Sequence, residues 1–419
     1  MTATLQRNNQ ATSPVTDEEL RARFAPVFDR LRIGAGQRER ERTHPFAEVD
    51  ELRKLGFGTL RLPPELGGLG TSMPQLFAML TDLAAADSNV TQALRQHFAR
   101  VERLLLHKDR PESRRWLDRV AAGELFGNGT TEPHGAKLGH IATRVRRDGD
   151  GYRLDGTKIY STGNLYAQWI PVAALDEAGQ PVLAIVSSSA PGVSILNDWD
   201  GFGQRLTGTD TTEFKNVHVP AGDVTPLEVF DGHHGAGFHQ LVLVAVLAGI
   251  GRAVRDDLVR EIQSRKRIYY TGTGELPRRD PIIQEAVGRA AATVEACDVL
   301  AAHASAALAD AWSLWTNGAD SGTVNTAFIG AENIIGMAQV VLSREIVDVA
   351  ARLFDSLGAS STLRENGLDR HWRNARTVAS HNSALFKARV VGDYLLNGTA
   401  PQIFRAGHDV GEKPYEATV

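Results

Sequence analysis

The feature of this 419-residue sequence that most constrains its fold is a pair of long segments, each with a single apolar stripe. In residues 283–308 and again in residues 331–353, apolar side chains recur every three or four positions, which is the spacing of one helix face. Helices of this length with one apolar face each bury that face against one another, so the sequence predicts a helical bundle. The two stripes comprise Ile283, Ala286, Val287, Ala290, Val294, Cys297, Leu300, Ala304 and Leu308, and then Ala331, Ile334, Ile335, Ala338, Val341, Leu342, Ile346, Val349 and Leu353.

The rest of the chain shows two other sequence patterns, one with helical periodicity and one with short β-prone runs. Apolar residues repeat at helical spacing from about residue 16 to 123, where Ser13 or Thr16 is a candidate N-cap for the first helix. A loop at 63–70 interrupts this zone, and the helical period resumes over 73–86 and 89–106. From 126 to about 219, short β-prone runs alternate with turns, and Asp148-Gly149-Asp150-Gly151 is typical of a hairpin.

These patterns predict an α+β chain that is mostly α. We expect four parts: a disordered lead-in over 1–15, an N-terminal helical domain over 16–125, a central β-barrel or sandwich domain over 126–225, and a C-terminal helical bundle domain over 226–419.

Charge and cysteine usage exclude several classes of protein. The 46 Lys and Arg residues nearly balance the 50 Asp and Glu residues, so the sequence predicts no basic face for a nucleic acid. The single cysteine, Cys297, excludes a disulfide framework and a zinc ribbon. The longest apolar run, Leu241–Ile250, is far shorter than the ~20 residues that span a bilayer, so we expect a buried helix in a soluble, cytoplasmic protein without a membrane partner.

Common catalytic motifs are missing from the sequence. It contains no His-Glu-x-x-His, no phosphate-binding Gly-x-x-x-x-Gly-Lys-Ser/Thr loop, no Gly-x-Ser-x-Gly elbow and no dinucleotide-binding Gly-x-Gly-x-x-Gly fingerprint. The one local histidine cluster, His233, His234 and His239, is interpreted as a surface or helix-start feature and not as a metal site.

Three stretches resemble the acyl-CoA dehydrogenases, in the order and at the separations found in that family. They are the loop Leu62–Gly70, the sequence Gly129-Thr130-Thr131-Glu132-Pro133 and the arginine-rich segment Arg370–Arg376. The resemblance implies an N-terminal helical domain, a central β domain and a C-terminal four-helix bundle.

The residues at the catalytic positions depart from that family. A dehydrogenase needs a glutamate that removes the substrate's α proton, and a missing base lowers the rate by about 10²–10⁴. By resemblance, the two positions that supply this glutamate fall at Asn382 and near Leu243. Neither side chain accepts a proton from carbon, so dehydrogenation of an acyl thioester is disfavoured.

Three other stretches resemble the flavin-dependent monooxygenases of the same fold, a group that includes dibenzothiophene monooxygenase and the amino-sugar nitrososynthases. They are Lys158–Asn164, Gly203–Gly208 and His381-Asn382. The resemblance implies reduced FMN, with FAD as second choice, supplied by a separate NAD(P)H:flavin reductase. It also implies O₂, a flavin C4a-hydroperoxide, and oxygenation of a small apolar substrate at sulfur, nitrogen or aromatic carbon. A homotetramer formed through the C-terminal bundle is implied as well.

The resemblance also indicates site residues. His381 is the first candidate for a proton donor, because the pKa of histidine lies near neutrality, and His97 is the second. Asn382 and Ser161 complete the expected catalytic set. The expected flavin-binding residues are Asn128, Thr130, Thr131, Tyr160, Ser161, Thr162, Arg265 and Gly358.

Each of these residues has a plain structural alternative. A histidine on a helix commonly packs or caps, and Ser161 is also compatible with an ordinary hydroxyl at the end of a strand. The run Arg265-Lys266-Arg267 either binds the flavin phosphate or is a solvated helix end. The segment Phe354–Ser360 resembles one that contacts the flavin of a neighbouring subunit, yet by pattern it is a helix C-cap with Gly358.

Two other functions remain open from the sequence. One is an acyl-CoA dehydrogenase with an unrecognised base, which acyl-CoA bleaching of a bound oxidised flavin would identify. The other is a flavin-free binding or scaffold protein, which would bind flavin in neither redox state.

Overall fold

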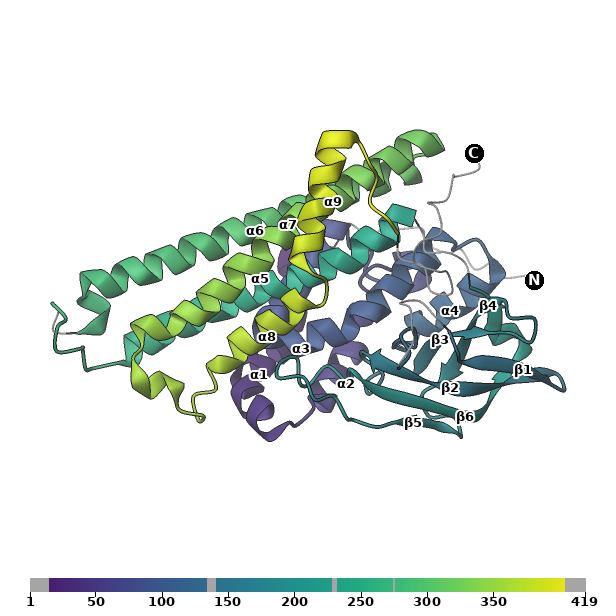
Figure 1. Ribbon diagram of the computed structural model, residues 1–419, viewed down its shortest axis with the longest axis horizontal. Coiled ribbons are helices and arrows are strands. Elements are labelled where there is room, and N and C mark those ends of the chain that lie inside the picture. Colours follow the sequence, from purple (N-terminus) through teal and green to yellow (C-terminus); the bar gives the residue numbers. More distant parts are fainter. Residues whose placement is uncertain (1–14, 134–140, 228–231, 274–275, 404–419) are drawn as a thin grey trace, which may run out of the picture.

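The computed structural model describes residues 15–133, 141–227, 232–273 and 276–403. The expected lead-in up to residue 14, with the candidate cap Ser13, lies outside these residues. Helices α1–α4 form the N-terminal part and helices α5–α9 the C-terminal part, with the strands between them (Figure 1). The helices are α1 (Asp17–Glu41), α2 (Phe46–Lys54), α3 (Met73–Leu106), α4 (Pro111–Ala121), α5 (Gly232–Ser264), α6 (Pro281–Thr316), α7 (Ser321–Arg352), α8 (Asp369–Ser380) and α9 (Ala384–Asn397). Short 3₁₀ turns lie between helices, and one, η3, lies between two strands: η1 (Phe57–Thr59), η2 (Pro64–Leu66), η3 (Ala221–Asp223), η4 (Pro277–Arg279), η5 (Leu353–Ser356) and η6 (Ala359–Thr362).

The first helix begins at Thr16, as one of the two predicted caps requires. The Thr16 hydroxyl accepts a hydrogen bond from the Glu19 N–H at 3.2 Å, and the Glu19 carboxylate accepts one from the Thr16 N–H at 2.8 Å. This reciprocal pair satisfies two N–H groups that a helix start leaves without partners.

Helix α3 contains a break at Asp87, where φ is −157° and ψ is 106°. The break separates the two helical segments predicted over 73–86 and 89–106, which run on as one element. The Asp87 carboxylate accepts from the Asn89 N–H at 3.1 Å and pairs with Arg38 at 2.8 Å. Asp87 therefore caps the second half of α3 and ties it to α1.

The strands form one mixed seven-stranded sheet in the order β5-β6-β2-β1-β3-β4-β7. All neighbouring strands pair antiparallel except β1 and β3. The predicted hairpin is present, because Asp148 and Gly151 are the last pair between β1 and β2. Side chains from both halves of the sheet pack into one core cluster, as expected for a barrel-like domain. The strands are β1 (Arg144–Asp148), β2 (Gly151–Ser161), β3 (Trp169–Leu175), β4 (Pro181–Ser187), β5 (Val193–Ile195), β6 (Asp210–Pro220) and β7 (Val224–Pro226).

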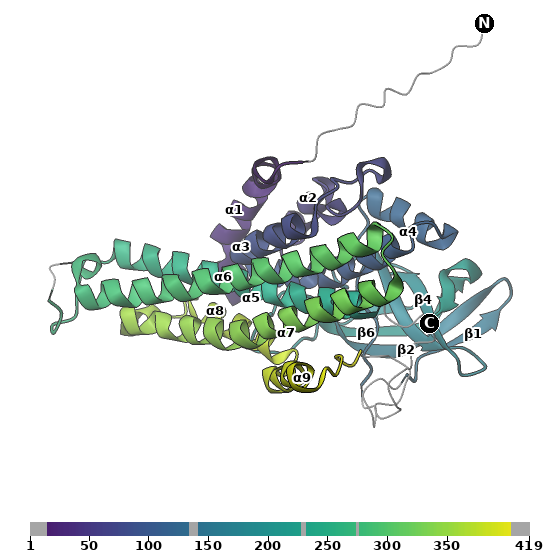
Figure 2. The ribbon, with the colours of Figure 1, turned by 90° about the horizontal axis from the view of Figure 1, so that it is seen from above.

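The C-terminal helices form the predicted bundle, in which α6 and α7 lie side by side along most of their length (Figure 2). Helices α5 and α8 complete four packed helices, and α9 packs against α7 and runs across the bundle (Figure 1). Most stripe residues are buried or packed against the core. Val341 is the exception, with 38% of its surface exposed, because the buried line of α7 passes through Ala338, Leu342 and Ile346 at four-residue steps.

Helix α5 is the central helix of the molecule. It packs against α3 as well as α6 and α7, and its segment Leu241–Ile250 is buried throughout, as predicted. Among the described helices, α5 is the one long and apolar enough to cross a membrane, and 78% of the relevant stretch is buried inside the protein. This burial is that of a core helix.

Candidate active site

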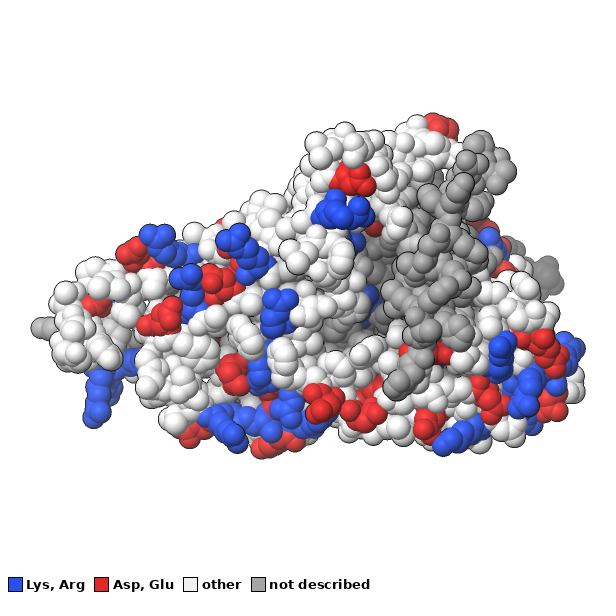
Figure 3. All heavy atoms as spheres, viewed as in Figure 1, with Lys and Arg blue, Asp and Glu red and all other residues white. Residues whose placement is uncertain are grey.

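A cavity of about 920 Å³ lies where α3, the β domain and the bundle meet. Figure 3 shows this face of the molecule hollowed between the bundle and the sheet. The volume is near the upper end of the range for small-molecule sites. The cavity is lined by Gln92, Arg95, Gln96, Asn128, Thr130, Thr131, Tyr160, Thr162, Trp199, Gly201, Phe202, Gln204, Thr209, Ala236, His239, Gln240, Glu332, Thr377, Val378, Ser380, His381, Asn382, Lys387, Gln402 and Ile403.

One wall of the cavity is the segment that enters the β domain. The backbone N–H of Asn128 donates to Asn164 Oδ1 at 2.7 Å, and the Thr130 hydroxyl donates to Asn128 Oδ1 at 2.8 Å. A Cβ atom on Gly127 would lie 2.0 Å from the same Asn164 oxygen, so a larger residue there would displace the Asn164 side chain. Asn164 thereby holds the predicted residues Asn128 and Thr130 at the cavity.

A buried ion pair joins two of the sequence motifs. Lys158 Nζ lies 2.5 Å from Glu132 Oε1, and the Lys158 side chain has no exposed surface. Burial lowers the pKa of Lys158. For Glu132 burial acts upward, but hydrogen bonds from Lys158 and Thr143 outweigh it and leave the pKa below its usual value. Glu132 is therefore a structural anion that fixes the segment with Thr130 and Thr131 against β2.

Three predicted site residues at the end of β2 point to different places: two line the cavity and one is buried away from it. Tyr160 has a φ of +53° and sits where the pairing of β2 with β6 shifts register. Such a bulge redirects the side chains that follow it. Tyr160 and Thr162 line the cavity, whereas Ser161 is buried outside the wall, and its hydroxyl has no hydrogen-bond partner among the described residues.

A chain of three hydroxyl groups ends at Thr162. Thr207 donates to the Gln204 carbonyl at 2.9 Å, Thr209 lies 2.6 Å from Thr207, and Thr162 lies 2.9 Å from Thr209. Each hydroxyl has one proton, so Thr209 must donate to Thr207, and Thr162 must donate to Thr209. The Thr162 oxygen is left with its lone pairs available, as an acceptor for an N–H group in the cavity.

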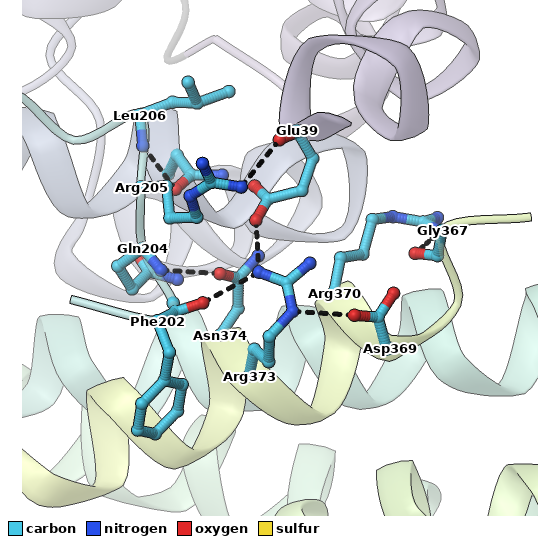
Figure 4. Close-up of polar contacts among 12 residues, drawn as sticks. Glu39, Phe202, Gln204, Arg205, Leu206, Gly367, Asp369, Arg370, Arg373 and Asn374 are labelled. Atoms are coloured by element: carbon cyan, nitrogen blue, oxygen red, sulfur yellow. Dashed lines mark hydrogen bonds and ion pairs between the residues drawn. The ribbon is translucent and has the colours of Figure 1, made fainter. Parts of the chain in front are cut away.

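The Gly203–Gly208 motif is locked to the helices behind it (Figure 4). The Gln204 N–H donates to Asn374 Oδ1 at 2.6 Å, and Arg373 donates to the Phe202 carbonyl at 2.8 Å. A Cβ on Gly203 would lie 2.1 Å from the Arg373 carbonyl, which explains the glycine. This anchoring holds the side chains of Phe202 and Gln204 at the cavity.

The opposite wall carries His381 and Asn382, which follow α8. Arg95 Nη1 lies 2.8 Å from His381 Nε2, so the imidazole accepts there and keeps its proton on Nδ1. The charge of Arg95 is the main cause that lowers the pKa of His381, to about 3, although the residue itself is exposed at the cavity. The sequence suggests a histidine that titrates near neutrality, but in this structure His381 is neutral at pH 7. Asn382 Nδ2 donates to Gln240 Oε1 at 2.7 Å.

His97 lies outside the cavity wall. Its Nε2 donates to the Gly58 carbonyl at 2.8 Å, and its Nδ1 accepts from the Phe126 N–H at 3.2 Å. The ring is completely buried, and burial lowers its pKa to about 4. His97 thus connects the N-terminal helices to the start of the β domain, and its proposed role as an acid stays a prediction.

Arg265 and Gly358 lie at the other end of the bundle. At about 1.5 Å per residue, α5 carries the chain roughly 39 Å from His239 in the cavity to Arg265. There Arg265 Nη1 donates to the Leu357 carbonyl, next to Gly358, whose φ of +71° and ψ of −178° precede η6 and differ from the left-handed helix C-cap predicted from the sequence, which is therefore wrong. The structure brings these two predicted residues together, but not with the other predicted flavin-binding residues of the same chain.

Several cavity residues were not predicted from the sequence. Arg95 and Gln92 lie on α3, Trp199 and Phe202 precede the Gly203–Gly208 motif, and His239 belongs to the histidine cluster interpreted as a helix start. Arg95 carried no signal of its own in the sequence, because the same helical stretch also contains Arg100, Glu102 and Arg103.

Glu332 is the one carboxylate among the described residues that line the cavity. It lies on α7, and its Oε2 is 2.7 Å from His233 Nδ1. Of the two positions that supply the base of a dehydrogenase, Asn382 lines the cavity, whereas Leu243 is buried in the core. The cavity therefore has an amide at the position where, by the resemblance, a dehydrogenase has its carboxylate.

Comparison with known proteins agrees with this architecture. Residues 16–124, 127–217 and 241–385 match, in turn, the N-terminal, middle and C-terminal domains of acyl-CoA dehydrogenases.

Two curated relatives and one solved structure are similar to most of the chain. The dibenzothiophene monooxygenase of Mycolicibacterium goodii is 26% identical over 371 residues, covering 84% of this chain and 88% of its own. The probable FMNH2-dependent monooxygenase SfnC of Pseudomonas putida is 26% identical over 367 residues, covering 85% and 89%. The crystal structure of FMN-bound TdsC from Paenibacillus sp. A11-2 superposes with a TM-score of 0.82 at 25% identity, covering 91% of this chain and 98% of that one. With all three domains matched in order, the chain belongs to the acyl-CoA dehydrogenase family.

Proposed function

We propose that this protein is a two-component flavin-dependent monooxygenase that uses reduced FMN and O₂ to oxygenate a small molecule at sulfur or nitrogen. The observation that carries the proposal is Asn382, which lines the cavity beside His381 where a dehydrogenase requires a carboxylate. The monooxygenase names of the relatives support the same branch of the family.

The residues of the cavity fit FMN. Asn128, Thr130, Thr131 and Thr162 offer hydrogen-bonding groups along one wall. The buried atoms Gln92 Oε1 and Gln204 Oε1 line the same cavity without a hydrogen-bond partner among the described residues, as expected for groups that face a polar ligand. Aromatic side chains of Tyr160, Trp199 and Phe202 offer surface for a planar ring system.

Bound reduced FMN would supply the electrons and activate O₂, and the protein would supply orientation, proton control and exclusion of water. Thr162 presents an acceptor oxygen, because the hydroxyl chain through Thr209 fixes the direction of its proton. This acceptor favours a ligand N–H over a ligand lone pair, and a reduced flavin ring carries more N–H groups than an oxidised one. His381 accepts from Arg95 at Nε2 and so holds its proton on Nδ1, and the Asn382 side chain is a further hydrogen-bond partner of the imidazole.

The partners of this enzyme are part of the proposal. Reduced FMN comes from a separate NAD(P)H:flavin reductase, and the enzyme acts in the cytoplasm. We keep 16–125, 126–225 and 226–419 as its working domain boundaries.

We also propose a homotetramer formed through the bundle. The strongly exposed apolar side chains of α9 support it: Leu385, Phe386 and Leu396 are 83%, 71% and 84% exposed. In such an assembly Arg265 and Gly358 would serve the flavin site of a neighbouring copy. Sedimentation equilibrium of the purified protein tests this, and a monomer would contradict it.

The His381→Ala variant tests the active-site assignment. Without the imidazole, we expect a folded protein that still consumes reduced FMN and O₂ but releases more hydrogen peroxide. The product yield should fall by about tenfold or more, because His381 no longer assists proton transfer. His97→Gln is the comparison variant, because His97 does not line the cavity. A product-to-peroxide ratio equal to that of the wild type would remove His97 from the catalytic set, and a lower ratio would keep it there. An unchanged ratio in His381→Ala would remove His381 from the mechanism.

A second candidate, an acyl-CoA dehydrogenase that uses Glu332 as its base, is less well supported. The Glu332 carboxylate is already hydrogen-bonded to His233 at 2.7 Å, which weakens it as a base for a substrate proton. Anaerobic addition of an acyl-CoA to the protein with oxidised flavin should leave the flavin absorbance unchanged.

A further inference from the structure

Arg95 is a buried cation at the cavity. It lies on the second half of α3 with only 5% of its surface exposed. Its Nη1 contacts His381 Nε2 at 2.8 Å, and its Nε donates to the His239 carbonyl at 3.2 Å. Neither contact uses Nη2, and one of the two Nη1 protons is also left over, so the guanidinium retains donors for a further acceptor.

The groups that hold Arg95 are neutral. The pKa of His381, which is exposed at the cavity, falls to about 3, chiefly through the charge of Arg95. The pKa of His239 falls to about 4, mainly through burial and then through Arg95. At pH 7 this cluster of one guanidinium and two imidazoles therefore carries a single positive charge.

Arg38, the other arginine classed as buried, has a carboxylate partner, and so do the half-buried Arg61 and Arg373. Arg38 pairs with Asp87 at 2.8 Å, Arg61 with Glu102 at 2.7 Å, and Arg373 with Glu39 at 2.5 Å. Arg95 has no carboxylate within ion-pair distance in the part of the chain that the structure describes. A buried charge without a counter-charge is strongly unfavourable, so proteins seldom keep one without a use for it.

The one acid on the described cavity wall does not neutralise Arg95. Glu332 is hydrogen-bonded to His233 at 2.7 Å, and it also raises the pKa of Lys387, against the stronger effect of burial on that amine. Lys387 is a second cation on the wall, so the cavity as a whole favours negative charge.

We propose that the molecule oxygenated in this cavity carries an oxyanion, a carboxylate, sulfonate or phosphate, and that Arg95 binds this group beside His381. The proposal rests on the proposed function and narrows its substrate class. The substrate then has two parts: an apolar body for the aromatic wall formed by Tyr160, Trp199 and Phe202, and an anionic group for Arg95. Guanidinium binds planar and tetrahedral oxyanions through paired N–H groups, which explains an arginine at this position.

Matched pairs of small aromatic probes test the proposal. Benzoate, benzenesulfonate and phenyl phosphate are compared with benzamide, benzenesulfonamide and phenol, by calorimetric titration and by the shift in Tm, with and without FMN. In the wild type we expect at least one anion to bind tenfold or more tightly than its neutral partner, and in Arg95→Gln we expect this preference to disappear. Arg95→Lys should recover part of the preference.

Two controls separate the possible outcomes. Lys387→Gln should keep the preference for the anion, which would exclude a general effect of any cation on the wall. Arg95→Gln should bind reduced FMN as the wild type does, and its Tm without ligand should not fall, because an uncompensated charge has been removed.

Three results would overturn the proposal: equal binding of anionic and neutral probes to the wild type, no binding of any probe, or loss of reduced-FMN affinity in Arg95→Gln with no change toward the probes. The last result would assign Arg95 to the flavin. A wild-type protein that binds no reduced FMN would instead contradict the proposed function, while the probe comparison would still decide the role of Arg95.

Discussion

His97 and His381 show how neighbours decide what a histidine does. Both are acid candidates in the sequence, and both are neutral at pH 7 in the structure. Both ring nitrogens of His97 are hydrogen-bonded to backbone groups, of Gly58 and Phe126, whereas His381 lines the cavity and contacts Arg95. The sequence cannot distinguish them, because Gly58 is 39 positions from His97 and Arg95 is 286 positions from His381.

The burial of His97 predicts a loss of stability in acid. Its pKa is about 4 when folded and about 6.5 when unfolded, so between these values the unfolded chain binds a proton that the folded protein does not. Stability therefore falls as the pH drops below about 6.5, by about 2 kcal/mol for this group between pH 8 and pH 5. His239 and His381, whose pKa values are also lowered, add to the loss with the same sign.

Urea denaturation at both pH values measures this effect. We expect the free energy of unfolding of His97→Gln to fall by about 2 kcal/mol less than that of the wild type between pH 8 and pH 5. The same fall in both proteins would show that His97 titrates normally in the folded state.

At the scale of elements, two sequence motifs turn out to be one structural unit. The Glu132–Lys158 pair fixes the segment before the sheet to β2, and Glu132 also accepts from the N–H groups of Ala142 and Thr143 at 2.6 and 3.0 Å. Thr130, Thr131 and Thr162 reach the cavity from the two sides of this unit.

Breaking the pair on one side should be costly. Glu132→Gln leaves the Lys158 ammonium buried without a counter-charge, which lowers the free energy of unfolding by about 3–5 kcal/mol. The double variant Glu132→Gln with Lys158→Met removes both charges and should recover most of that loss. Guanidinium denaturation of the three proteins provides the measurement, and a double variant no more stable than the single one would refute the explanation.

The elements that sequence predicted best are those with a strong local signal. Apolar period predicts the helices, including the two halves of α3 on either side of Asp87, and the turn residues predict the β1–β2 hairpin. The backbone conformation of Tyr160 could not be predicted, because its φ of +53° follows from a register shift with β6 and not from its residue type. Val341 was misplaced because a stripe read from sequence is wider than the line actually buried.

At the scale of the whole molecule, the order of helices, sheet and bundle was predictable, but the cavity between them was not. Its walls come from α3, the 128–131 segment, β2, the 199–209 loop, α5 and α7–α9, which only the tertiary fold brings together. The resemblance to known enzymes indicated residues such as Asn128 and His381, because motifs carry that information. Arg95 belongs to none of the quoted motifs, and its importance appears only from its burial and its neutral partners.

The proposed function depends on how reduced FMN reacts with O₂ when it is bound to the protein. The most direct measurement is rapid mixing of the protein, loaded anaerobically with reduced FMN, with O₂-saturated buffer, followed by absorbance. We predict a transient spectrum, distinct from both reduced and oxidised FMN, that forms on the protein and outlasts anything seen with free flavin. Direct conversion to oxidised FMN, at the rate of free flavin and without a transient, would contradict the assignment as a flavin-dependent monooxygenase.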